Sequence, residues 1–133
     1  MEEIRFTVPG DPVGYLRMTQ GQIGLLRIPR ARLYASSVPI VDRIRKYEAY
    51  KSLICVCCPP FPPELISAKK IYMALNIWFR SGKHADPDNV FKAFADALFK
   101  NDNRVAGFFD FFFNPENPRV EVKIKLLTQG GNP

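Results

Sequence analysis

Hydrophobic residues recur with two different periods along this chain, and the order of those periods limits the folds open to it. Alternating or β-rich runs predict strands at residues 4–8, 69–80, 105–113 and 119–127. Apolar residues at three- and four-residue steps predict helices at residues 38–58 and 86–99. The order β-α-β-α-β-β therefore indicates an α+β fold, in which helices pack against one mixed β-sheet.

A single domain spanning residues 1–133 is expected, because a chain of this length can bury a core of its own without disulfides. The prolines and asparagines of the NPENP segment, residues 114–118, predict a hairpin between the last two strands. Residues 15–38 show no sustained period, and we expect a basic loop or a short hairpin there.

Charge is unevenly distributed along the chain, whose formal net charge is +6. Residues 17–46 contain seven basic side chains and a single acid, Asp42, whereas acids gather at residues 86–110. A merely solvated basic face would explain this pattern, and so would a nucleic-acid partner. If the partner is DNA, the candidate binding residues are Arg17, Arg27, Arg30, Arg32 and Lys83.

A cytoplasmic protein without a membrane segment is expected. The opening MEEIRFTVPG lacks the basic and apolar regions of a secretory signal, and no apolar run reaches the roughly 18 residues of a membrane span. Three cysteines, Cys55, Cys57 and Cys58, are expected to be buried free thiols. A zinc site would need all three together with His84, the single histidine.

Four acids lie close together in residues 86–102, and they admit two interpretations. Helix capping explains Asp86 as the N-cap, Pro87 as the first helical residue and Asp88 as a charge near the positive end of the helix dipole. Alternatively, Asp86, Asp88 and Asp102 would meet and repel one another unless a cation lay between them. Oxygen ligands of this kind suit Mg²⁺.

The segment DPDNVFKAFADALFKNDNRV, residues 86–105, resembles the RusA family of Holliday junction resolvases. That resemblance implies Asp86, Asp88 and Asp102 as metal ligands and Lys92 as the catalytic lysine, and it places Asp96 in the family's Asp-Ala-Leu element. Asn101 departs from the family pattern, which has an acid there. The opening FTVPGDPVGYLRM also looks like the family's first strand and loop.

The resemblance implies a structure-selective endodeoxyribonuclease of DNA recombination and repair. It would depend on Mg²⁺, with Mn²⁺ expected to substitute, and would resolve Holliday junctions as a homodimer. Asp86, Asp88, Lys92 and Asp102 would be its catalytic residues. Two alternatives stay open from the residues themselves: a non-catalytic DNA-binding module, and a nuclease for flaps or other branched DNA.

Overall fold

The computed structural model describes residues 3–99 and 102–126 of the chain. Four strands form one sheet in the order β1-β4-β2-β3: β1 (Ile4–Pro9), β2 (Ile71–Phe79), β3 (Val105–Phe113) and β4 (Arg119–Leu126). Strand β4 pairs antiparallel with β1 and β2, whereas β2 and β3 pair parallel. The predicted mixed sheet is confirmed.

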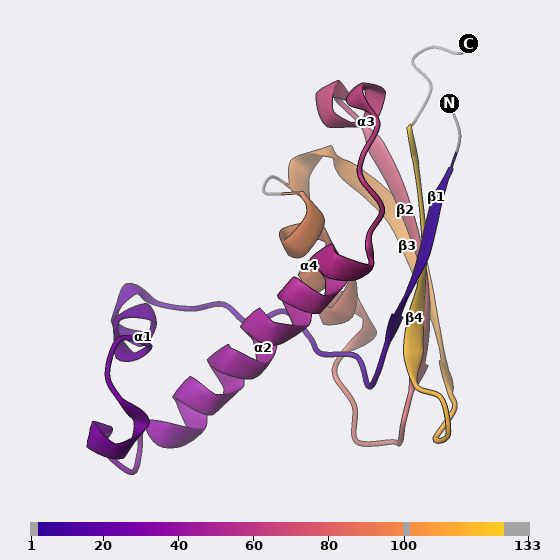
Figure 1. Cartoon of the computed structure of the whole chain (residues 1–133). Coiled ribbons are helices and arrows are strands. Elements are labelled where there is room, and N and C mark those ends of the chain that lie inside the picture. Colours follow the sequence, from indigo (N-terminus) through magenta and orange to yellow (C-terminus); the bar gives the residue numbers. More distant parts are fainter. Residues whose placement is uncertain (1–2, 100–101, 127–133) are drawn as a thin grey trace.

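Two helices cover one face of this sheet, α2 (Val38–Cys57) and α4 (Pro87–Leu98) (Figure 1). Between them and the sheet lies the core, formed by alternate residues of β2 with Tyr50 and Ile54 of α2 and Val90 and Phe94 of α4. Burying each such aliphatic or aromatic side chain contributes about 1.5–3 kcal/mol. The predicted α+β class is therefore confirmed.

Helix α4 connects the parallel strands β2 and β3, because parallel neighbours need a crossover rather than a tight turn. Gly107 of β3 pairs with Met73 of β2. A Cβ atom at position 107 would lie 1.8 Å from the carbonyl oxygen of Met73. Glycine at this position therefore permits the close approach of the two strands.

The hairpin predicted between β3 and β4 is wrong. Both strands flank β2 and neither pairs with the other. The intervening segment does turn, since the Asn117 amide donates to the Asn114 carbonyl, but the Asn114 amide donates to Phe79 at the end of β2. The chain thus crosses the end of β2, because β2 already occupies the edge at which a hairpin partner would lie.

Four short helices of the described residues were not predicted: α1 (Gln20–Leu25), α3 (Pro63–Ser67) and the 3-10 helices η1 (Arg30–Arg32) and η2 (Asp102–Arg104). The expectation of a loop or hairpin at residues 15–38 is therefore wrong in part. A capping box begins α1, in which Thr19 and Gln22 exchange side-chain and backbone hydrogen bonds. This short signal carries no hydrophobic period, so a search for periodicity overlooks it.

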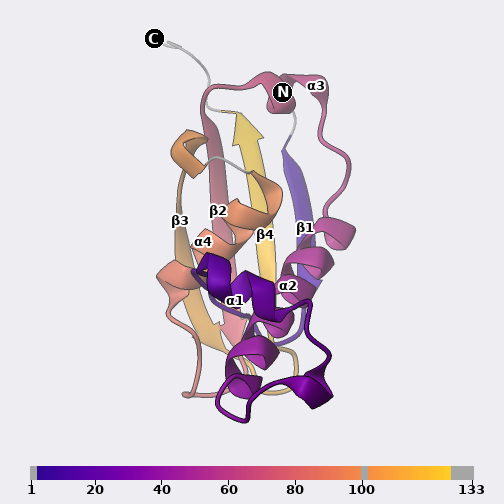
Figure 2. The same ribbon diagram turned by 90° about the vertical axis from the view of Figure 1, so that its left-hand side faces the viewer.

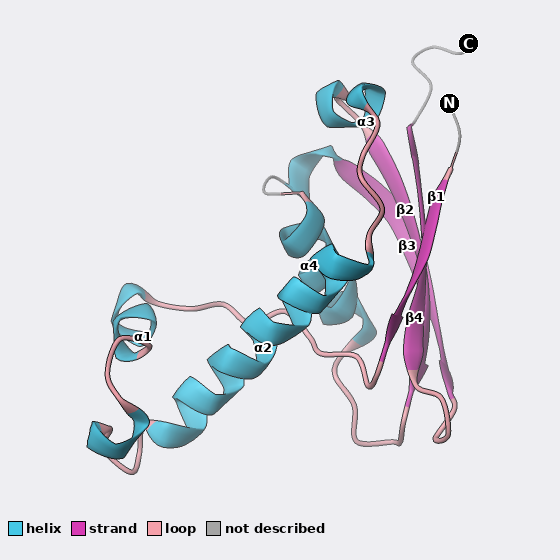
Figure 3. Cartoon of the chain, in the orientation of Figure 1, coloured by secondary structure: helices cyan, strands magenta, loops and turns pink. Residues whose placement is uncertain are grey.

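Residues 17–37 form an arm that stands away from the sheet beside the N-terminal half of α2 (Figures 1 and 3). The arm carries α1 and η1, and α1 contacts α2. Helix α2 has 20 residues, which corresponds to a length of about 30 Å. Its C-terminal half packs on the sheet, while its N-terminal half extends the molecule toward the arm.

Two further expectations concern the burial of the cysteines and the absence of a membrane segment. Cys55, Cys57 and Cys58 are free thiols, as predicted, but Cys55 is exposed and the other two are half-buried, so the predicted burial is wrong. Within residues 3–99 and 102–126, no helix is both long enough and apolar enough to cross a membrane.

Candidate active site

Asp86 and Asp88 lie together where α4 begins. Asp86 is the N-cap residue, and its Oδ1 atom accepts a hydrogen bond of 3.0 Å from the amide of Asp88. Pro87 occupies the first turn, where its missing amide hydrogen leaves no helical bond unmade. The geometry confirms the capping interpretation of these residues. The capping hydrogen bond uses one of the two carboxylate oxygens of Asp86.

Lys92 extends back along α4 toward Asp88. Its Nζ atom lies 3.3 Å from Oδ2 of Asp88, the i,i+4 arrangement that one helical turn favours. Both side chains are about half exposed. A cation and a carboxylate are thereby held side by side at the solvent-facing start of the helix.

Asp96 lies on a different side of α4 from Asp88 and faces α2. Its Oδ2 atom accepts hydrogen bonds from the hydroxyl of Tyr47 at 2.7 Å and from Nζ of Lys51 at 3.1 Å. Residues eight apart on a helix differ by about 80° in direction, which explains the separation from Asp88. Asp96 therefore connects α4 to α2.

Burial and the charge of Asp96 together shift the pKa values of Tyr47 and Lys51. Burial, and then the hydrogen bond to Asp96, raises the pKa of Tyr47, so the hydroxyl remains a donor. Burial by itself would lower the pKa of Lys51. The hydrogen bond to Asp96 and the charges of Asp96 and Glu48 outweigh it, and the pKa of Lys51 is raised.

Asp102 begins the 3-10 helix η2 (Asp102–Arg104), which follows the C-terminal end of α4 (Figure 2). Arg104 fixes η2 by donating to the carbonyls of Ile66 and Ala68. The side chain of Asp102 lies outside what the structure describes, as does Asn101. Their predicted part in a metal site stays a prediction.

The carboxylates of Asp86 and Asp88 suit a magnesium site in which the protein supplies only a few of the ligands. Oδ2 of Asp86 makes no hydrogen bond within the described part of the chain, and the carboxylate of Asp88 is about half exposed. Mg²⁺ is usually held by one or two carboxylates, with waters and substrate phosphates completing its octahedron. Among the described residues, no group of three or more His, Cys, Asp or Glu side chains lies close enough together to hold a metal ion by itself.

A pocket of about 600 Å³ adjoins these acids. Its walls come from the loop after β1, from α2 and from the residues that lead into α4, and Asp86 lines it. Three cations line the same pocket: Arg43 and Lys46 of α2, and Lys83. Of the predicted DNA-binding residues, Lys83 is the one placed beside the acids.

The other predicted DNA-binding residues lie on or beside the arm. Arg17, Arg27 and Arg32 are exposed there. Arg30 instead forms an ion pair with Asp42, 3.1 Å between Nη2 and Oδ2, and this hydrogen bond lowers the pKa of Asp42. Because its charge is already paired, Arg30 has less to offer a phosphate than its neighbours.

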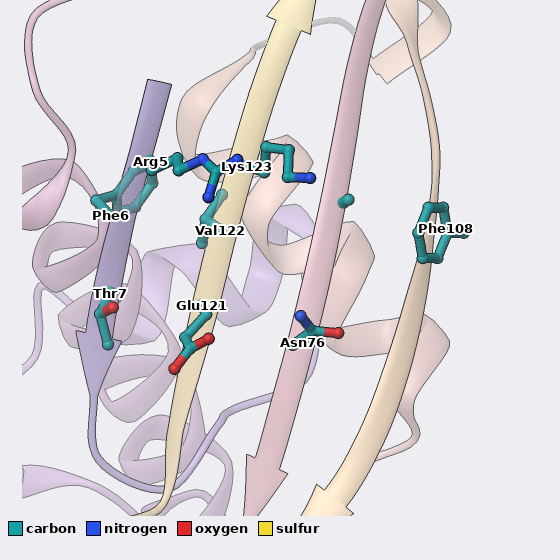
Figure 4. A pocket seen from close by; sticks show the side chains of 9 residues that line it. Arg5, Phe6, Thr7, Asn76, Phe108, Glu121, Val122 and Lys123 are labelled. Carbon is teal, nitrogen blue, oxygen red and sulfur yellow. The ribbon is translucent and has the colours of Figure 1, made fainter. Parts of the chain in front are cut away.

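A second hollow lies on the sheet face opposite the helices, above β1, β4 and β2 (Figure 4). Its volume is about 390 Å³, and its single acid, Glu121, is 3.2 Å from Arg119. Lys123, Asn76 and Phe108 also line it. With one paired carboxylate, this hollow lacks the ligands for a metal-dependent reaction, and we place the candidate site at α4.

Sequence reasoning did not single out Arg43, Lys46 and Asp11 as residues of the pocket. A helical wheel of α2 could have found the first two, because both lie beside the buried Tyr47 at the edge of the apolar face. Asp11 gives no such signal. It enters the pocket through a long-range hydrogen bond, in which the amide of Arg80 donates to Oδ1 at 2.9 Å.

Comparison with known families adds to this geometry. A family model described as endodeoxyribonuclease RusA matches residues 32–125, more than two thirds of the chain. The matched segment includes the start of α4 and Lys92, and it begins after the opening strand and loop, whose likeness to the family stays a prediction. A search of curated proteins gave no match.

Proposed function

The chain belongs to the RusA family of endodeoxyribonucleases, and from this membership we propose that it is a Mg²⁺-dependent enzyme that resolves Holliday junctions. The observation that carries the proposal is the group formed by Asp86, Asp88 and Lys92 beside a pocket lined by cations. A phosphodiesterase needs this combination, since its substrate is an anion and its metal a cation.

In the proposed reaction, water attacks the phosphorus, the bond to the 3′ oxygen breaks, and that oxygen leaves with a proton. The products are a 5′-phosphate and a 3′-hydroxyl. Bound Mg²⁺ would lower the pKa of a water ligand and polarise the phosphate. Asp86 and Asp88 would hold the ion, with Asp102 as the third predicted ligand.

Lys92 has the position for electrostatic stabilisation. Its ammonium group would move from Asp88 to the oxygens of the cleaved phosphate once that carboxylate binds a cation. Negative charge develops on those oxygens during the reaction, and a fixed cation offsets it. The helix keeps Lys92 within one turn of Asp88 throughout, so little reorganisation is required.

A homodimer is part of this proposal, because a four-way junction has approximate two-fold symmetry and paired cuts require two related sites. Strand β3 lies at the edge of the sheet, and its Phe108 and Phe112 lie on the open sheet face, 54% and 43% exposed. Its other exposed phenylalanines, Phe111 and Phe113, lie on the face that the helices cover. Apolar patches of this kind mark interaction surfaces. We assign the patch to a second copy of the chain.

Charge on the open sheet face favours the same partner. Asp110 lies among the phenylalanines of β3, whereas Lys123 and Lys125 lie on β4, at the other side of the face. A two-fold axis parallel to the strands would place β3 of one copy opposite the β1–β4 side of the other. The side that carries Asp110 would then face the side on which Arg5, Arg119, Lys123 and Lys125 outnumber Glu121, and the two-fold axis repeats this contact.

Cleavage of matched substrates tests the proposed function. The protein is incubated with an immobile four-way junction, a flap and a linear duplex of the same sequence, in Mg²⁺, in Mn²⁺ and in EDTA. We expect symmetric, ligatable nicks in the junction alone, in either metal and not in EDTA. Cleavage of the flap alone would replace the assignment with another branched-DNA nuclease, and binding without cleavage would leave a DNA-binding module.

A further inference from the structure

The pocket beside Asp86 has the features of a second binding site. We propose that it holds a phosphodiester of the DNA backbone next to the cleaved one, contacted by Arg43, Lys46 and Lys83. This inference rests on the proposed function for its substrate, DNA. It adds a site that would determine the path along which the DNA strand approaches Asp86 and Asp88.

Charge in the pocket favours an anion. Arg43, Lys46 and Lys83 form no ion pair with any acid in the described part of the chain. The two acids that line the pocket are each engaged in a backbone hydrogen bond, Asp11 from Arg80 and Asp86 from Asp88. Three unpaired cations therefore face the same space, and a phosphate would give them charge-assisted hydrogen bonds.

Tyr15 and Tyr47 form a part of the pocket wall that contacts within the protein hold in place. Tyr47 is almost fully buried and is held by Asp96. Tyr15 packs its ring edge-on against Tyr47 at 5.9 Å, and its amide donates to the Asn89 carbonyl at 2.8 Å. A pocket with such walls loses little conformational entropy on binding, which favours selection by shape.

Gly14 gives the loop its close approach to α4. A Cβ atom at position 14 would lie 3.1 Å from Cβ of Ala85 and 3.2 Å from Cβ of Asn89, tighter than ordinary contacts. The loop therefore lies directly on the residues that begin α4. The pocket and the acids consequently share one wall, Asp86, so a phosphate bound in the pocket would be a close neighbour of the one being cut.

Two variants of α2 distinguish the contribution of the pocket to DNA binding from that of positive charge elsewhere on the same helix. Arg43 and Lys46 are three residues apart and share one side of the helix, whereas Arg45 lies two residues from Arg43, about 200° around the helix axis. Arg45 does not line the pocket, and its charge acts on Asp42. Arg45→Ala thus removes a cation from the same helix and leaves the pocket intact.

The test measures junction binding without metal as a function of salt. Each lost contact with a duplex phosphate lowers the log-log salt slope by about 0.9, so Arg43→Ala/Lys46→Ala should lower it by about 1.8. We expect affinity at fixed salt to fall at least about ten-fold, since hydrogen bonds between charged groups are among the stronger ones. An unchanged slope and affinity in the double variant would overturn the inference.

Methylphosphonate substitution locates the phosphate. Single neutral linkages are placed within four nucleotides of the branch point, and binding is measured for wild type, Arg43→Ala/Lys46→Ala and Arg45→Ala. One position should weaken binding strongly for wild type and Arg45→Ala and much less for the double variant, in which only Lys83 is left to contact the charge that the substitution removes. Equal effects on all three proteins at every position would refute the pocket.

The outcome also separates this inference from the proposed function. If the wild type cleaves junctions and the double variant shows no change in slope or linkage dependence, the pocket assignment fails alone. If the wild type cuts no DNA but the slope and linkage effects appear, the site stands and the catalytic proposal fails.

Discussion

Replacing Asp88 with asparagine distinguishes a metal ligand from a helix-capping charge, because the exchange is nearly isosteric. As a capping charge, Asp88 contributes through the helix dipole, about 0.3–1 kcal/mol at an exposed position. Its ion pair with Lys92 adds about 0.3–0.5 kcal/mol, and the exposed fractions of 54% and 52% favour the lower values. Asp88→Asn should therefore cost at most about 1.5 kcal/mol of unfolding free energy.

Thermal unfolding, junction binding and junction cleavage are measured on the same preparation. The melting temperature should fall by only a few degrees, as a loss of this size predicts. Cleavage in Mg²⁺ should fall by orders of magnitude, since the ion loses one of its charged ligands. Binding in EDTA should hold or tighten, because one negative charge that faces the phosphates is gone.

Glu116→Gln provides the matched control, since Glu116 is an exposed acid in the turn before β4 that neither belongs to α4 nor lines the pocket beside it. It should retain cleavage, binding and stability. Wild-type cleavage by Asp88→Asn at the same Mg²⁺ concentration would refute the metal assignment and leave Asp88 as a helix-capping charge.

Further predictions concern the dimer, the arm and the sheet. Sedimentation at micromolar concentration should show a dimer that Phe108→Ser/Phe112→Ser converts to a folded 15.2 kDa monomer; a wild-type monomer, with and without junction, would contradict the interface. Arg27→Ala/Arg32→Ala should lower the salt slope of junction binding by about 1.8, and an unchanged slope would make the arm a solvated surface. Gly107→Ala should destabilise the fold by several kcal/mol in denaturant unfolding, because its Cβ would meet the Met73 carbonyl; wild-type stability would argue against this β2–β3 register.

Local patterns predicted the elements of this fold better than its connections. The alternation in β2 and the apolar face of α4 depend on which residues are buried, and burial leaves a period in the sequence. The pairing of β4 with β1 and β2 leaves no such mark. A turn sequence at residues 114–118 favours a reversal of the chain, and it does not say which strand already lies alongside.

The same distinction applies to the candidate site. Asp86, Asp88 and Lys92 lie within seven residues of one helix, so their proximity follows from the helical repeat alone. Asp96 follows Lys92 at the same four-residue step by which Lys92 follows Asp88, but its angular offset turns it to Tyr47 and Lys51, which only the packing of α2 reveals. Likewise, Asp11 reaches the pocket from the end of β1, 75 positions before Asp86 in the printed sequence.

Capping and metal binding are compatible roles for the acids of α4, because they use different lone pairs. The cap engages Oδ1 of Asp86 through the amide of Asp88, and this hydrogen bond fixes the carboxylate relative to the helix. Oδ2 remains available for an ion, as do the half-exposed oxygens of Asp88 once Lys92 turns to a phosphate. A carboxylate already oriented by its cap has less freedom to lose when it binds a cation. The residues that determine where α4 begins would therefore also determine where the metal sits, so substitutions at this site are informative only when stability and cleavage are measured together.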